Sequence, residues 1–150
     1  MSGVTTTGST IITNIEDMSA GILLWRSLLQ WLGGIGIIVM AISILPVLQV
    51  GGMQVFRTES SDTSDKILPR TAQVASAVLS IYILLTSLCA LGYWIFGMQI
   101  FDAVNHSMTT IATGGFSTKS GSIGAFNSSG IDYVSSIFMI LASLPILVYL

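Results

Sequence analysis

Charged residues are scarce in this sequence: Lys, Arg, Asp and Glu together make up 8% of its 150 residues. Soluble domains carry about 25% charged residues. Hydrophobic residues, by contrast, reach 52% of the chain. This composition excludes an ordinary soluble domain and predicts an integral membrane protein that is surrounded by lipid.

Other side chains that carry chemistry are also few. The formal net charge of −2 is too small to indicate nucleic acid as a partner. Cys89 is the only cysteine, which excludes an internal disulfide and a cysteine-based metal cluster. His106 has no second His, Cys or carboxylate at ligand spacing, so we expect no metal centre there. Because no Ser–His–Asp arrangement, Walker loop or pair of catalytic carboxylates stands out, we expect neither an enzyme nor a cofactor.

Long apolar segments dominate what is present. About 20 apolar residues are needed to cross a hydrocarbon core about 30 Å thick. The candidate spans are residues 22–50, 74–98 and 134–150. Pro46 is expected to bend or end the first span. Tyr93 and Trp94 are placed like an interfacial aromatic belt near the end of the second.

The segment 51–70 is the one solvent-like loop between spans. It holds three of the five basic residues, Arg57, Lys66 and Arg70. The positive-inside rule therefore predicts a cytoplasmic loop. The next connection, 99–133, would then begin and end on the outside.

Residues 99–113 predict an amphipathic helix of about four turns, with Ile100, Ala103, Val104 and Met108 on its apolar face. Asp102 falls in the first turn, where a carboxylate suits the helix dipole. Such a helix is too short to cross a bilayer. It is therefore interfacial or re-entrant.

The glycine-containing segment 113–118 follows this helix directly. Non-helical backbone at membrane depth is tolerated where it is buried in protein or lines a watery cavity. Span, half-helix, loop and span form a pore-loop unit, whose carbonyls can replace the hydration shell of a cation. An extracellular Gly/Ser turn is the alternative.

A second copy of this order of parts occurs at the start of the chain, in residues 4–10. Setting Gly8 against Gly115 places Thr7 opposite Gly114, and a span follows each segment. Internal repeats are common in membrane transport proteins. The sequence therefore predicts two pore-loop units, the first without its leading span and half-helix.

Four stretches carry a resemblance to a known family: TTTGST, WLGGIGIIVMAISILPVLQVGGMQ, FDAVNHSMTTIATGGFST and the SIGAF that follows. They resemble the membrane subunit of Trk-type bacterial potassium uptake systems (TrkH, with KtrB and HKT as relatives). The resemblance implies an all-α membrane fold of four span–pore-loop–span repeats around one pore. It also implies that backbone carbonyls of two filter segments bind K⁺, at Thr6, Thr7, Gly8, Thr113, Gly114 and Gly115.

The resemblance further implies a multi-pass protein of the bacterial cytoplasmic (inner) membrane, a homodimer, and a cytoplasmic nucleotide-binding regulatory subunit of the TrkA type. Residues 1–50 would end repeat 1, residues 51–70 would form the cytoplasmic loop, and residues 71–150 would form repeat 2. Repeats 3 and 4 are absent. We therefore expect the chain to be part of a longer transporter.

Two other hypotheses remain open at this point. One is a short chain with two pore loops that completes its filter by dimerisation. The other is a non-conducting membrane scaffold or assembly subunit, whose glycines serve helix packing alone.

Three minor expectations concern residues around the filter. The glycines at 33, 34 and 36 favour close packing rather than a dinucleotide-binding loop. Glu16 and Asp17 would either concentrate cations at the outer mouth or form a solvated face. Hydroxyl groups are expected mainly to buttress the loops, at Thr5 to Thr7, Ser9, Thr10, Thr113, Ser117 and Thr118.

Overall fold

The computed structural model describes residues 1–48 and 67–144. This part of the chain is helical and contains no strand, which confirms the predicted all-α class. The elements are α1 (Ala20–Leu48), α2 (Ile67–Ile95), α3 (Ile100–Ile111), the short 3₁₀ helix η2 (Ser122–Phe126) and α4 (Ser129–Ser143).

Two of the described helices are long and apolar enough to cross a membrane. They are α1 and α2, each of 29 residues, or about 43 Å. Both agree with predicted spans, although α1 continues through Pro46 to Leu48. α4 covers the start of the third predicted span. The rest of that span and residues 51–66 of the predicted cytoplasmic loop lie outside the described residues. The predicted end of the loop at Arg70 was wrong, because α2 already begins at Ile67.

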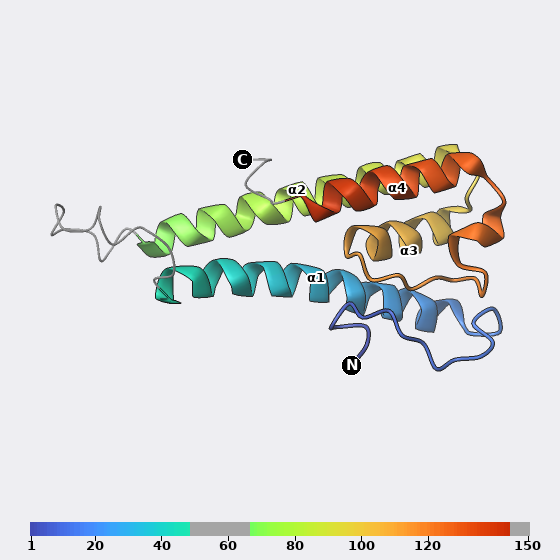
Figure 1. The fold of residues 1–150 in the computed structure, drawn as a ribbon, viewed down its shortest axis with the longest axis horizontal. Coiled ribbons are helices and arrows are strands. Elements are labelled where there is room, and N and C mark those ends of the chain that lie inside the picture. The colour runs from blue at the N-terminus through green and yellow to red at the C-terminus, as the bar shows by residue number, and fades with distance from the viewer. Residues whose placement is uncertain (49–66, 145–150) are drawn as a thin grey trace, which may run out of the picture.

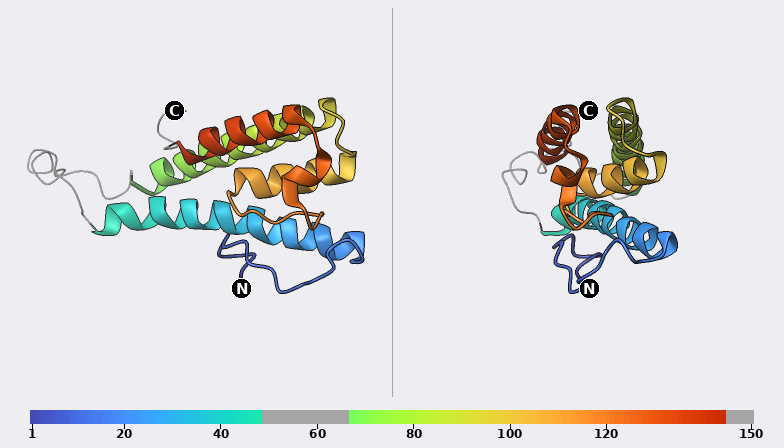
Figure 2. Two further views of the ribbon diagram at one scale, coloured as in Figure 1. Left: turned by 45° about the vertical axis from the view of Figure 1, so that its right-hand side comes forward. Right: turned by 90° about the vertical axis from the view of Figure 1, so that its right-hand side faces the viewer.

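The short helix α3 lies between the long ones (Figures 1 and 2) and contacts α1, α2 and α4. It begins at the end of the molecule where α2 finishes and stops part-way along α1. From its C-terminus the chain turns back toward η2, and α4 then runs antiparallel to α2. This arrangement places the segment 112–121 inside the helical frame.

The predicted short helix is confirmed as α3, and most of its polar side chains are buried. In contrast, Ile100 is 66% exposed and Phe101 is also exposed. The amphipathic pattern did not say which side of the helix faces inward. α3 packs inside the protein, where Asp102 and His106 bond to the segment that follows and Thr110 bonds to Tyr93. The buried polar residues are Asp102, Asn105, His106, Ser107, Thr109 and Thr110.

Tyr93 is a second correction. It is fully buried, and its hydroxyl lies 2.8 Å from the hydroxyl of Thr110 in α3. It therefore does not belong to an interfacial belt, whereas the neighbouring Trp94 is exposed. The tyrosine ring joins α2 to α3 in the core, together with Cys89 and Ile131.

Close helix packing is confirmed at one of the three glycines in α1, Gly34. A Cβ atom on Gly34 would lie 2.8 Å from the Tyr82 hydroxyl and 3.4 Å from Ala112. A Cβ on Gly33 would overlap the backbone of Val4, so this glycine admits the N-terminal loop rather than a helix. A Cβ on Gly36 would meet nothing within 4 Å.

Candidate functional site

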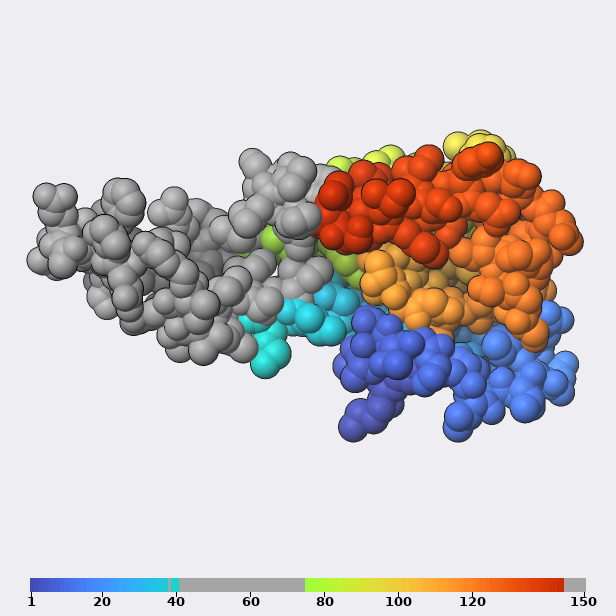
Figure 3. Space-filling model, viewed as in Figure 1, coloured from blue at the N-terminus to red at the C-terminus, as the bar shows by residue number. Residues whose placement is uncertain are grey.

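The two glycine loops that the sequence pairs as repeats lie against each other. They are the loop around Gly8 (the N-terminal or first loop) and the loop around Gly115 (the second loop). Figure 3 shows the N-terminal segment directly beside the segment that follows α3. The closest approach is at Gly8, where a Cβ atom would overlap the carbonyl oxygen of Gly114. Residues more than 100 positions apart in sequence thus form one backbone cluster.

The two loops share an unusual backbone conformation. Thr6 and Gly8 have φ angles of 53° and 75°, and Thr113 and Gly115 have φ angles of 50° and 76°. The alignment of Gly8 with Gly115 therefore also pairs equal backbone angles. Positive φ is rare for a β-branched residue and persists where the surroundings hold it in place. Its recurrence at matching positions points to function rather than to an ordinary turn.

Most carbonyl oxygens in these loops are free of protein partners. Within the described residues, no protein group donates a hydrogen bond to the carbonyls of Thr6, Thr7, Gly8, Thr113 or Gly115. The Gly114 carbonyl alone among the six predicted filter positions accepts one, from the side chain of Gln30 in α1. A carbonyl has two lone pairs, so this bond leaves one of them available.

Helix α1 supports both loops. Gln30 Nε2 donates to the Gly114 carbonyl at 2.8 Å, and Gln30 Oε1 accepts from the Phe116 N–H at 3.3 Å. One turn earlier, Arg26 Nη2 donates to Thr10 Oγ1 at 2.6 Å, and its guanidinium lies 4.3 Å from the centre of the Phe116 ring. Arg26 therefore joins the N-terminal loop to the second loop.

Helix α3 holds the part of the chain that leads away from the second loop. Thr118 donates to the carboxylate of Asp102 at 2.7 Å. His106 Nδ1 donates to the Asp102 carbonyl at 2.8 Å, so in the neutral ring Nε2 is free to accept from Ser117 Oγ, 3.0 Å away. Ser117 Oγ also accepts from the backbone N–H of Lys119.

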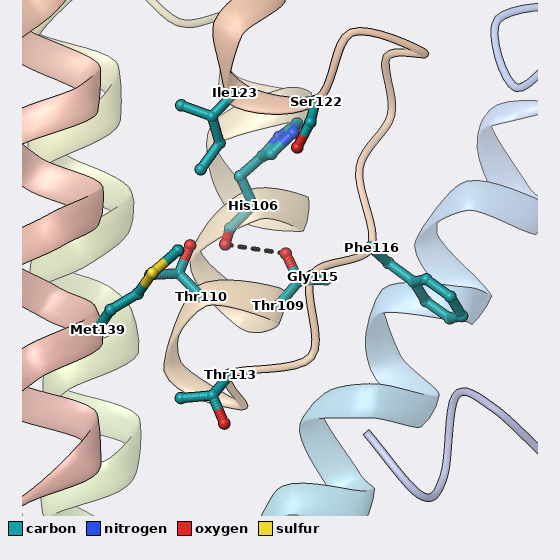
Figure 4. Close-up of a pocket in the computed structure, with 9 residues that line it drawn as sticks. All are labelled: His106, Thr109, Thr110, Thr113, Gly115, Phe116, Ser122, Ile123 and Met139. Carbon is teal, nitrogen blue, oxygen red and sulfur yellow. Dashed lines mark hydrogen bonds between the residues drawn. The ribbon is translucent and has the colours of Figure 1, made fainter. Parts of the chain in front are cut away.

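A cavity of about 200 Å³ borders the second loop on the side of α4 (Figure 4). It lies between the C-terminal turns of α3, segment 113–116, η2 and Met139 of α4. A Cβ atom on Gly115 would meet nothing within 4 Å. The second loop therefore rests on α1 on one side and is unpacked at Gly115.

The loop hydroxyls act mainly within the protein, as predicted. Thr5 bonds to Met1 and lies beside Thr7, and Thr113 donates to Ala112. The buttressing role is confirmed at Thr5, Thr7, Ser9, Thr10, Thr113, Ser117 and Thr118. It is not seen at Thr6, whose hydroxyl makes no hydrogen bond within the described residues. Glu16 and Asp17 are exposed, and neither of their two predicted roles is decided.

Sequence reasoning missed the residues that hold the loops. Gln30 is fully buried in a predicted span, where an unpaired amide would be costly. That glutamine was the available signal, because a polar side chain inside an apolar helix requires a partner. Its partners are 84 and 86 residues away, which no local pattern shows.

The geometry is accompanied by a clear family match. The sequence model of a family described as TrkH, cation transport protein, matches residues 1–147. This chain belongs to the TrkH family. It is accordingly a membrane protein. Its curated relatives are named as uptake proteins and not as enzymes.

Relatives of known name resemble the whole chain. The Trk system potassium uptake protein TrkI of Halomonas elongata is 53% identical over 151 residues, which cover 100% of this chain and 31% of that protein. The Trk system potassium uptake protein TrkH of Escherichia coli is 48% identical over 143 residues, covering 94% of this chain and 30% of the relative. The chain thus spans about 30% of the length of these relatives.

A solved structure gives the same result. The crystal structure of the potassium transporter TrkH from Vibrio parahaemolyticus superposes with a TM-score of 0.84 at 41% sequence identity. The match covers 99% of this chain and 29% of that one. The helical arrangement described above is therefore a fold found in a membrane transporter.

The His106 contacts predict a pH dependence of stability. Burial lowers the pKa of His106, although the backbone carbonyl and the charge of Asp102 raise it in part. Since the unfolded value is about 6.5, unfolding takes up a proton below that pH. The neutral ring therefore contributes fully to the free energy of unfolding above about pH 6.5. This contribution is lost as the pH falls toward the pKa of His106 in the folded protein.

We expect the thermal midpoint of the purified protein to fall more steeply between about pH 7 and pH 5 than that of a His106→Gln variant. The difference between the two profiles isolates this ring from the carboxylates, which titrate in both proteins. Parallel profiles would contradict the assignment.

Proposed function

We propose that this chain supplies two sides of the ion filter of a potassium uptake transporter. Support comes from the paired loops, which share alternating positive φ angles. They also present five carbonyl oxygens that accept no hydrogen bond from the part of the chain that the structure describes. Carbonyls arranged in this way replace the water around a cation at small net cost. The names of the relatives, which are potassium uptake proteins, favour K⁺ as the ion.

The filter segments in this proposal are Thr6–Gly8 and Thr113–Gly115. Four sides are needed for a complete cage, so the other two come from further repeats of the transporter. α3 ends at Ile111, directly before the second segment, so the negative end of its dipole favours a cation there.

The same proposal extends to location and assembly. The transporter would be a multi-pass protein of the bacterial inner membrane, in agreement with the two described helices that are long and apolar enough to span it. A homodimer and a cytoplasmic nucleotide-binding subunit of the TrkA type follow from the resemblance to Trk systems. Co-purification of the tagged transporter with such a subunit tests the second partner.

The test uses a complete transporter. In the E. coli relative, the segment that this chain matches is replaced by this chain, and the product is expressed in a strain that lacks potassium uptake. We expect it to restore growth at low K⁺. A Gly115→Asp variant should fail to do so, because a carboxylate in the second segment would hold the cation too tightly for it to leave.

Membrane levels of both proteins must be equal, as judged by immunoblotting. A variant that restores growth as well as its parent would refute the filter assignment. If the unsubstituted replacement is made but stays inactive, the chain is not a conducting part, and the scaffold hypothesis is favoured.

A further inference from the structure

Among the side chains of α1 that the structure describes, Gln30 is the most completely enclosed polar one. Its exposed fraction is 0%, although it lies in a helix of strongly apolar composition. Burying an amide is unfavourable unless its groups are hydrogen-bonded. Here the amide nitrogen and the amide oxygen both bind backbone atoms of the second loop. The side chain is thus fixed at both of its functional atoms.

The two bonds lie on either side of Gly115. The Gly114 carbonyl belongs to the peptide unit before Gly115, and the Phe116 N–H belongs to the unit after it. Each peptide unit is planar, so a bond to one atom orients the whole unit. Gln30 therefore fixes both peptide planes around the residue with a φ of 76°.

This geometry also sets the direction of the Gly115 carbonyl. In a trans peptide the C=O and N–H groups point in opposite directions, and the described residues contain no cis peptide bond. Because the Phe116 N–H points toward Gln30 on α1, the Gly115 carbonyl points away from α1. That carbonyl accepts no hydrogen bond from the described part of the protein.

Neighbouring residues fit around this clamp. A Cβ atom on Gly114 would overlap the amide group of Gln30, so position 114 has no room for a side chain. The Phe116 ring is 8% exposed and lies against Arg26, which holds the far end of the segment. The loop and α1 are thus complementary in shape as well as in hydrogen bonding.

We infer that Gln30 is a positioning residue that determines ion selectivity, because it aims the Gly115 carbonyl toward the ion path. The inference rests on the proposed filter function. Discrimination between K⁺ and Na⁺ depends on how many carbonyl oxygens face the ion and how firmly they are held. A loop released from Gln30 has carbonyls that tilt to fit the smaller ion.

The first test replaces Gln30 by leucine in the complete transporter. We expect the ratio of Rb⁺ to Na⁺ uptake, with Rb⁺ as the tracer for K⁺, to fall about 10-fold while transport continues. Ser27→Ala is the matched control, because Ser27 is also a buried polar residue of α1 but bonds within its own helix, to Leu23. The control should keep the ratio of the parent.

The second test uses Gln30→Glu and changes only the pH. A protonated carboxyl group has one O–H donor and one carbonyl acceptor, so it can replace both bonds of the amide. The ionised form lacks the donor and repels the Gly114 carbonyl. We expect selectivity near that of the parent at about pH 6 and its loss at about pH 9, in one protein preparation.

The outcomes separate the two proposals. An inactive parent, or an active Gly115→Asp variant, counts against the filter itself. With the filter upheld, an unchanged Rb⁺/Na⁺ ratio in Gln30→Leu, or no more pH dependence in Gln30→Glu than in the parent, overturns the role of Gln30. Failure of both Gln30 variants to accumulate, when Ser27→Ala does, would assign Gln30 to folding and overturn the inference equally.

Discussion

Gly8→Ala in the complete transporter is expected to reduce Rb⁺ uptake by about 100-fold or more. Two effects combine at this position. A residue with a side chain at positive φ is strained by about 1–2 kcal/mol. In addition, the new Cβ would overlap the Gly114 carbonyl, so the two loops must separate. Separation would destroy the spacing of the carbonyls on both segments.

Gly115→Ala is the matched control for this prediction. Gly115 has almost the same φ as Gly8, 76° against 75°, but a Cβ there would meet nothing within 4 Å. The strain is shared by both variants, whereas the overlap is specific to Gly8. We expect Gly115→Ala to lower Rb⁺ uptake by about 30-fold at most, since a strain of about 1–2 kcal/mol corresponds to a factor of about 5 to 30. Equal losses would show that the loops do not touch in the working transporter.

Sequence reasoning located the helices and the loops because their signals are local. Spans of apolar residues, a short helix after the second span and glycines at 8, 114 and 115 are all visible in short windows. The pairing of the loops followed from the order of parts repeated in the chain. The structure adds equal φ angles at the paired positions, which no composition could reveal.

The faces of α3 could not be predicted in the same way. A helix surrounded by water buries its apolar side, and that rule alone would place Asp102 and His106 outside. In a membrane protein, polar groups find partners inside the protein, and apolar ones can face lipid. Asp102 and His106 accordingly hold the returning chain from within.

The supports of the second loop were invisible for a different reason. Gln30 and Arg26 belong to the span that follows the first loop, yet both reach the second. Their contacts depend on how α1 packs beside α3, which is a property of the folded repeat pair. A substitution one turn further along α1, at Gly33, tests how the same helix supports the first loop.

Gly33→Ala is expected to lower Rb⁺ uptake at least about 10-fold and to lower the thermal midpoint of the purified complete transporter. The reason is the Val4 backbone, which a Cβ on Gly33 would overlap. Helix propensity alone predicts the opposite, because alanine stabilises a helix over glycine by about 0.5–1 kcal/mol. The sign of the stability change thus reports whether the N-terminal loop rests on α1.

Gly36→Ala supplies the comparison in the same helix. A Cβ at that position meets nothing within 4 Å, so only helix propensity changes the stability. The thermal midpoint should therefore stay level or rise. Uptake should remain within about 2-fold of the parent, since a stability gain of about 0.5–1 kcal/mol in the helix alters no contact of the loops. If both glycines respond alike, the N-terminal loop is not seated on α1, and the first filter segment loses its support. If instead the thermal midpoint falls in Gly33→Ala and rises in Gly36→Ala, the first loop is held in place by α1, the helix that also supports the second loop.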